Sequence, residues 1–181
     1  EIPLRLVGSE MCIRDRLTNA IRQEKRSTRE LYTSIDERLG KFEPREVEVN
    51  GEKVMVQPQE QAAYDAAVEL LKAGDYKKAA AAFSTFGAEW PKSAYAADAV
   101  YWRGSCLFAL EQYKSTINVQ NSLIRSYPKH PRVADAMISV ASSQAALGNV
   151  KAASATLAKV IKQYPNSDAA KTAAQLQKTL K

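Results

Sequence analysis

The spacing of apolar positions changes twice along the chain and divides it into three segments. From Leu17 onward, apolar residues recur at alternating steps of four and three positions, the seam of a left-handed coiled coil. Around residues 47–56 the spacing becomes two, as in a strand, and from residue 59 it becomes helical again. The pattern predicts a coiled-coil helix, an extended linker and a helical domain, in that order.

The predicted coiled-coil helix covers residues 17–42. Glu24 and Arg38 interrupt its seam, so the helix would be marginal as an isolated oligomer. A single amphipathic helix resting on its own domain fits the pattern equally well. The oligomerisation seam, through which we expect self-association, consists of Leu17, Ile21, Thr28, Leu31, Ile35 and Phe42.

Residues 43–58 read as a linker bounded by Pro44 and Pro58. Asn50-Gly51 is a strong signal for a two-residue hairpin turn. The positions that alternate around this turn are Val47, Val49, Val54 and Val56. Because a lone hairpin is only marginally stable, we interpret the segment as a linker with a small β-hairpin rather than as part of a sheet domain.

An aromatic-proline pair recurs every 37 residues in the last segment. The pairs are Trp90-Pro91, Tyr127-Pro128 and Tyr164-Pro165. Three further sets of positions keep the same register: Tyr76, Tyr113 and Val150; Ala79, Thr116 and Ala153; and Phe83, Gln120 and Leu157. The repeat therefore extends through the helices as well as the turns.

Each repeat reads as two helices joined by a turn. Gly74 and Gly148 suit the left-handed residue that closes a first helix, and the proline after each second helix stops it. Tyrosine, alanine, aromatic and proline in this order form the tetratricopeptide (TPR) pattern. The predicted fold is all-α, with three TPR-like helical hairpins in a right-handed solenoid. Its boundaries are about 59–92, 93–129 and 130–166 for the repeats within a domain of residues 59–181, and 167–180 for a C-terminal capping helix.

Stacked hairpins curve so that their first helices line a concave surface, which predicts a peptide groove. Aromatic residues supply rigid contact area there, and a nearby lysine favours an acidic segment. For Leu71, Phe108 and Tyr101, packing in the core between neighbouring helices is the alternative. The predicted partner-binding residues are Tyr64, Val68, Leu71, Lys72, Tyr101, Ser105 and Phe108.

The formal charge of +6 is unevenly distributed. Residues 1–60 carry 11 Lys or Arg against 12 Asp or Glu, whereas residues 61–181 carry 15 against 8. This excess favours an acidic protein partner or nucleic acid, although a solvated helical surface with spare lysines is commoner. Because basic and aromatic residues do not interleave on one surface, we expect no nucleic-acid partner.

Enzyme chemistry has little support. His130 is the only histidine and follows Lys129 in a turn, a poor place for a buried general base. Cys12 and Cys106 are too few for a disulfide framework or a metal cluster. We expect no catalytic residues, no metal site and no cofactor, and the absence of a long apolar run predicts no transmembrane segment.

Residues 1–16 do not fit the patterns that follow them. They lack periodicity and the features of an export signal, and residues 7–16 resemble peptides translated from sequencing-adapter DNA. We expect this segment to be non-native, with the true N-terminus and any signal peptide missing.

The segment from Leu17 to Lys181 resembles the YbgF/CpoB family of proteins associated with the Tol-Pal system. The resemblance lies in residues 36–44, which read DERLGKFEP, in residues 63–67, which read AYDAA, and in the Tyr-Pro-Asn-Ser-Asp ending. The order of coiled coil, proline-bounded linker and three repeats favours this family. Tyr-Pro-x-Ser repeats alone are less specific, since outer-membrane assembly lipoproteins share them.

This resemblance implies a periplasmic protein whose coiled coil trimerises and whose repeats bind TolA or another envelope protein segment. It further implies a role in coordinating outer-membrane constriction with septal peptidoglycan synthesis during division. With most of the coiled coil missing, trimerisation of this chain is in doubt. The alternative is a TPR scaffold subunit of an outer-membrane protein assembly complex.

Overall fold

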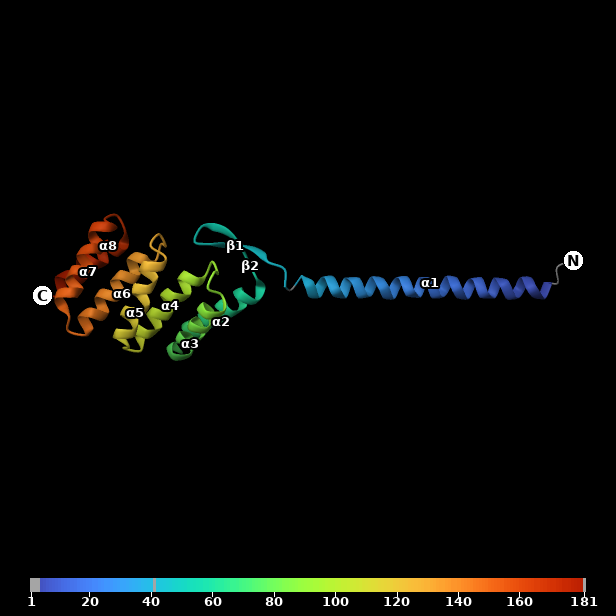
Figure 1. Ribbon diagram of the computed structural model, residues 1–181, viewed down its shortest axis with the longest axis horizontal. Helices are drawn as coiled ribbons and strands as arrows, with labels where there is room; N and C mark the ends of the chain where they lie inside the picture. Colours follow the sequence, from blue (N-terminus) through green and yellow to red (C-terminus); the bar gives the residue numbers. More distant parts are fainter. Residues whose placement is uncertain (1–3, 41, 181) are drawn as a thin grey trace. The chain divides into compact units, whose positions relative to one another are not determined.

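The computed structural model describes residues 4–40 and 42–180. The chain forms two compact units, Glu1–Glu43 and Pro44–Lys181, and each is described by itself. Figure 1 labels the helices and strands of both.

The first unit contains one long helix, α1 (Leu4–Leu39). The helix includes residues of the first sixteen, for which the sequence showed no periodicity. It ends where Gly40 donates its backbone N–H to the carbonyl of Asp36 at 2.8 Å. Phe42, expected on the oligomerisation seam, therefore lies beyond the last helical residue.

The second unit opens with an antiparallel hairpin of β1 (Arg45–Val49) and β2 (Glu52–Val56). Asn50 and Gly51 have φ of 54° and 84°, the two positive values that a tight type I′ turn requires. One face of the hairpin carries four valines together with Arg45 and Glu52 at its ends, and Val49 and Val56 on this face are buried. The hairpin is thus held by burial of one face in addition to its own hydrogen bonds.

Helices account for most of the remaining chain and pack in sequence order, each against the next. First helices also contact each other across repeats, since α4 touches α6 and α6 touches α8. The repeats are α2 (Pro58–Lys72) with α3 (Tyr76–Glu89), α4 (Ala96–Ala109) with α5 (Tyr113–Ser126), and α6 (Val133–Ala146) with α7 (Val150–Gln163), followed by α8 (Asp168–Thr179). Figure 1 shows this stack, and the predicted all-α, TPR-like solenoid is confirmed.

The core follows the repeat register. The small residues Ala79, Thr116 and Ala153 are all 0% exposed, which lets paired helices approach closely. Larger side chains fill the space beside them, with Phe83 and Leu157 fully buried in the first and third repeats. Their counterpart in the second repeat is a glutamine, discussed below.

The turns inside the hairpins share one backbone conformation. Gly74 and Gly148 have φ of 77° and 80°, as expected for residues that close a helix in the left-handed region. Glu111 occupies the same register position in the second repeat, with φ of 58°. A non-glycine residue therefore carries the left-handed conformation there.

Candidate protein-interaction surface

The predicted inner face consists of the first helices α2, α4 and α6, and on α2 its predicted aromatic residue is Tyr64. The Tyr64 ring stacks on Tyr95 with centroids 4.5 Å apart and planes inclined by 13°. It also meets Phe83 and Phe86 edge to face, at 6.0 and 5.6 Å. Tyr64 is therefore half-buried, with one ring face covered by the residue that precedes α4.

Tyr101 takes the same place on α4, and Arg132 covers it. The guanidinium carbon of Arg132 lies 5.0 Å from the Tyr101 ring centroid and 4.6 Å from that of Trp102. Such cation–π contacts contribute about 0.5–2 kcal/mol each. Arg132 is thus held in place by the two aromatic rings as well as by an ion pair with Asp98.

The Tyr64–Tyr95 and Tyr101–Arg132 contacts occupy equivalent positions at two successive junctions between repeats. Tyr95 immediately precedes α4, and Arg132 immediately precedes α6. The two residues are 37 positions apart, as Tyr64 and Tyr101 are. In both repeats the aromatic side chain packs against the neighbouring repeat. Both tyrosines consequently serve the joint between repeats as well as the inner face.

The other predicted partner-binding residues on α2 and α4 differ in exposure. Val68 and Leu71 are partly buried and pack against the core of the first repeat, while Lys72 is exposed and pairs with Glu69 at 2.9 Å. Ser105 donates its hydroxyl to the carbonyl of Tyr101 at 3.2 Å.

Phe108 is the most exposed apolar residue of the predicted set. It is 37% exposed, and its ring meets Tyr113 edge to face at 5.6 Å. Phe108 and Lys72 are therefore the exposed members of the predicted set.

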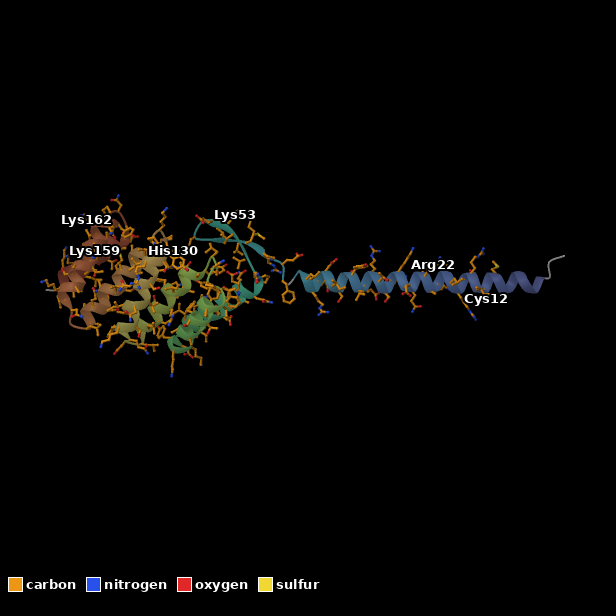
Figure 2. All side chains as sticks on the ribbon, in the orientation of Figure 1. Cys12, Arg22, Lys53, His130, Lys159 and Lys162 are labelled. Atoms are coloured by element: carbon orange, nitrogen blue, oxygen red, sulfur yellow. The ribbon has the colours of Figure 1, made fainter. Side chains whose placement is uncertain are left out.

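A polar cluster around Asp98 anchors the hairpin to the repeats. Asp98, in α4, is only 4% exposed and forms an ion pair with Arg132. The side-chain amide of Asn50 donates to Asp98 at 3.0 Å and lies 3.1 Å from Nε2 of His130. His130, labelled in Figure 2, lies 3.6 Å from the same carboxylate.

From the sequence, His130 was expected to be a solvated turn residue or a weak helix cap, and this cluster was not predicted. The signals that could have pointed to it were the Asn-Gly turn and a carboxylate at an otherwise buried helix position. Because buried charges are costly unless paired, Asp98 required a cationic partner. The cluster joins the hairpin, the second repeat and the start of the third.

Burial raises the pKa of four side chains here, namely Tyr64, Tyr95, Tyr101 and Cys106. It raises the pKa of Tyr64 from 10.0 to about 12, with the nearby Asp98 carboxylate adding to the effect. The pKa of Tyr101 is also raised, first by burial and then by Asp135. Burial likewise raises the pKa of the Cys106 thiol to about 11, so Cys106 is an unreactive core residue.

The predicted oligomerisation seam is exposed on α1. Leu17, Ile21 and Leu31 are 58%, 55% and 61% exposed, Ile35 is 40% exposed, and Thr28 is also exposed. The apolar residues of the predicted seam that lie within α1 are therefore all exposed in this unit.

Two kinds of site are lacking in the parts of the chain that the structure describes. Residues 4–40 and 42–180 contain no group of three or more His, Cys, Asp or Glu side chains placed to hold a metal ion. None of the helices within these ranges combines the length and the apolar character needed to span a bilayer.

Stacked helical hairpins with a half-exposed inner face define a TPR-type protein-interaction scaffold. Residues 56–181 match the family model YfiO, described as outer membrane lipoprotein, and the chain belongs to this family. A segment of 41 residues is also 49% identical to the cell division coordinator CpoB of Pseudomonas putida. That segment is 23% of this chain and 15% of the length of that relative.

Solved structures with similar folds include two bacterial proteins. The type III secretion chaperone SycD of Yersinia enterocolitica, in complex with a peptide of the translocator YopD, matches with a TM-score of 0.59 and 16% identity, over 69% of this chain and 94% of SycD. PcrH from Pseudomonas aeruginosa matches with a TM-score of 0.58 and 15% identity, over 70% and 95% of the two chains. At these identities the likeness shows the fold alone.

Proposed function

We propose that this protein is a non-enzymatic adaptor of the periplasm that binds a protein segment on the inner face of its repeats and self-associates through α1. The observation that carries this proposal is the exposed apolar seam of α1, on the same chain as a TPR scaffold. A scaffold with two uncovered surfaces is suited to bringing two proteins together. The complex of SycD with a translocator peptide is a precedent for peptide binding by this fold.

The proposed partner is TolA, and the proposed role is to help coordinate outer-membrane constriction with septal peptidoglycan synthesis during cell division. Two observations support this choice. One is the 49% identity to cell division coordinator CpoB over 41 residues, and the other is the order of helix, linker and repeats that the YbgF/CpoB resemblance rests on.

Within the inner face, we assign direct contact to the exposed members of the predicted set and a shaping role to the tyrosines. Phe108 and Lys72 are exposed, and Val68, Leu71 and Ser105 are partly buried. Tyr64 and Tyr101 pack against the next repeat through Tyr95 and Arg132. An acidic, apolar segment of TolA would match the phenyl ring and the ammonium group.

Sedimentation equilibrium of the chain with and without the periplasmic part of TolA tests the proposal. We expect an oligomer that becomes heavier with TolA, and loss of that complex in Phe108→Ala combined with Lys72→Glu. Met55→Ala combined with Lys77→Glu is a matched control, because Met55 is 65% exposed on the hairpin and Lys77 is exposed on α3. Equal binding by both double variants would refute the site, and a chain that ignores TolA would refute the partner.

Self-association is tested separately with Leu31→Glu, which places a charge on the seam of α1. We expect this variant to sediment as a monomer while its repeats retain their thermal stability. An unchanged oligomer would show that another surface holds the copies together.

The second candidate function is a scaffold subunit of an outer-membrane protein assembly complex. The YfiO family match over residues 56–181 specifically favours it. Crosslinking a tagged copy in intact cells distinguishes the two candidates. Recovery of TolA supports the adaptor, and recovery of outer-membrane assembly proteins without TolA supports the scaffold.

A further inference from the structure

An open groove of about 680 Å³ runs over α6, between the second helices α5 and α7. We call it the α6 groove. Its floor is apolar and consists of Val133, Met137 and Val140, which are 3%, 7% and 3% exposed. Ile124 and Tyr164 form apolar parts of its walls. The volume lies within the range of about 300–1,000 Å³ that is typical of ligand sites.

The rim of the α6 groove is polar and carries a single charged side chain, Lys159. Within the described ranges, Lys159 forms no ion pair, and the amides of Asn121 and Gln163 form no side-chain hydrogen bond. Thr156 donates to the amide oxygen of Gln144 at 2.9 Å, which ties α7 to α6 across the groove. The α6 groove thus presents side-chain donors that have no partner within the described residues, among them the ammonium group of Lys159.

The helices around the α6 groove are strongly basic. Residues 113–163 contain one acidic residue, Asp135, and the basic residues are Lys114, Arg125, Lys129, Arg132, Lys151, Lys159 and Lys162, of which Arg132 is paired with Asp98. Figure 2 labels Lys159 and Lys162, which both belong to α7 and are three positions apart. The local field therefore attracts anionic groups toward α7.

The corresponding positions of the earlier repeats lack this chemistry. In the 37-residue register, Ser122 and Thr85 stand where Lys159 stands, and Val119 stands where Thr156 stands. The charge at the groove is therefore particular to the joint between the second and third repeats. A general need to keep helical repeats solvated would not single out this joint.

We propose that the α6 groove binds an acidic peptide segment of a partner protein. A carboxylate of the segment pairs with Lys159, adjacent apolar side chains lie over Ile124 and Tyr164, and its backbone accepts from the amides of Asn121 and Gln163. This surface is formed by second helices and the helix between them, so it is separate from the inner face and does not depend on which envelope protein occupies that face.

Fluorescence anisotropy with three labelled probes of equal length tests the proposal. The probes are a peptide alternating Glu and Leu, its counterpart alternating Gln and Leu, and a single-stranded DNA oligonucleotide. We expect the Glu/Leu peptide to bind, the Gln/Leu peptide to bind more weakly, and Lys159→Glu to weaken Glu/Leu binding about fivefold or more. Lys151→Glu is the matched control, since it makes the same charge change on α7 outside the groove.

Three outcomes would overturn the proposal. Equal binding of the Glu/Leu and Gln/Leu peptides would exclude recognition of charge. Equal effects of Lys159→Glu and Lys151→Glu would show that the overall positive charge of α7, rather than Lys159, attracts the peptide. Tighter binding of the DNA, lost in Lys159→Glu, would assign the groove to nucleic acid. Only the part of the binding that depends on Lys159 tests this proposal, because Lys72 on the inner face could also attract the Glu/Leu peptide. TolA binding is tested separately with Phe108→Ala and Lys72→Glu, so this proposal and the proposed function fail independently.

Discussion

The side chain of Gln120 lies directly over the backbone of Gly104, where a Cβ atom would come within 2.3 Å of Nε2 and 2.5 Å of the amide carbon. In the other repeats, the same pair of positions is Ala67 with Phe83 and Ala141 with Leu157. The second repeat thus combines the smallest residue with a buried amide. Gln120 is 0% exposed, so its amide would have to shift within the packed core to admit a side chain at position 104.

We predict that Gly104→Ala lowers the free energy of unfolding by about 1–3 kcal/mol, because the new methyl group overpacks the joint between α4 and α5. Gln120→Leu should instead raise it by about 1 kcal/mol. The amide oxygen of Gln120 is buried without a hydrogen-bond partner, and the Tyr101 carbonyl that its nitrogen meets also accepts from Ser105. Urea denaturation of both variants measures the effects, and a clearly destabilised Gln120→Leu would contradict this account.

The backbone at Glu111 gives a second prediction. This residue adopts the left-handed conformation that glycine provides in the other two repeats, a conformation that is unfavourable for residues with a Cβ atom. Glu111→Gly should therefore raise the free energy of unfolding by about 0.5–1 kcal/mol, less than the full strain because glycine gains freedom in the unfolded chain. Gly148→Ala is the reciprocal control and should destabilise. Thermal or urea melts that show no difference in sign between the two would refute the prediction.

Substitutions of Asp98 and of Asn50 in the Asp98 cluster should have different effects. Asp98→Ala should lower the free energy of unfolding by about 3 kcal/mol, because it leaves Arg132 without its buried counter-ion. Asn50→Gly keeps the positive φ of the turn and removes only the amide that donates to Asp98.

Hydrogen exchange separates these two effects. In Asn50→Gly, amides of β1 and β2 should exchange faster while those of α4–α7 change little. Unchanged exchange in the hairpin would show that burial of Val49 and Val56 alone holds it in place.

The raised pKa of Tyr64 predicts a loss of stability in alkali. An unfolded tyrosine ionises near pH 10 and folded Tyr64 near 12, so the native state holds more protons in this interval. The contribution of Tyr64 is therefore complete below about pH 10 and is lost as the pH rises toward 12. Urea denaturation at a series of pH values from about 9 to 12 measures this loss. The free energy of unfolding should fall less steeply with pH for Tyr64→Phe, which keeps the ring and removes the ionisable group. Identical slopes would contradict the shift.

The period of the repeat was enough to predict the solenoid, because the positions that set helix packing and turns recur in the sequence. It placed Phe83, Gln120 and Leu157 in register, but it did not reveal that Gly104 compensates for Gln120. Compensation between two positions depends on side-chain contacts across helices, and a pattern along one chain does not show them.

The candidate surfaces were harder to predict for the same reason. Tyr64 and Tyr101 were expected to face a partner, whereas Tyr95 and Arg132 cover one face of each. The α6 groove escaped notice because its volume results from the sizes of side chains on three different helices. The helical start of α1 was missed because an exposed helix can form without apolar periodicity.

The hairpin changes how the array should lose its structure. In a simple solenoid each repeat touches only its neighbours, so terminal repeats can fray alone. Here the turn at Asn50, which precedes the first repeat, reaches Asp98 in the second and His130 before the third, residues 48 and 80 positions away. The first repeat is therefore enclosed by contacts on both sides, and its melting requires release of the hairpin from the later repeats. This long-range closure makes the N-terminal half of the array a cooperative unit, in which the first repeat does not melt independently of the second.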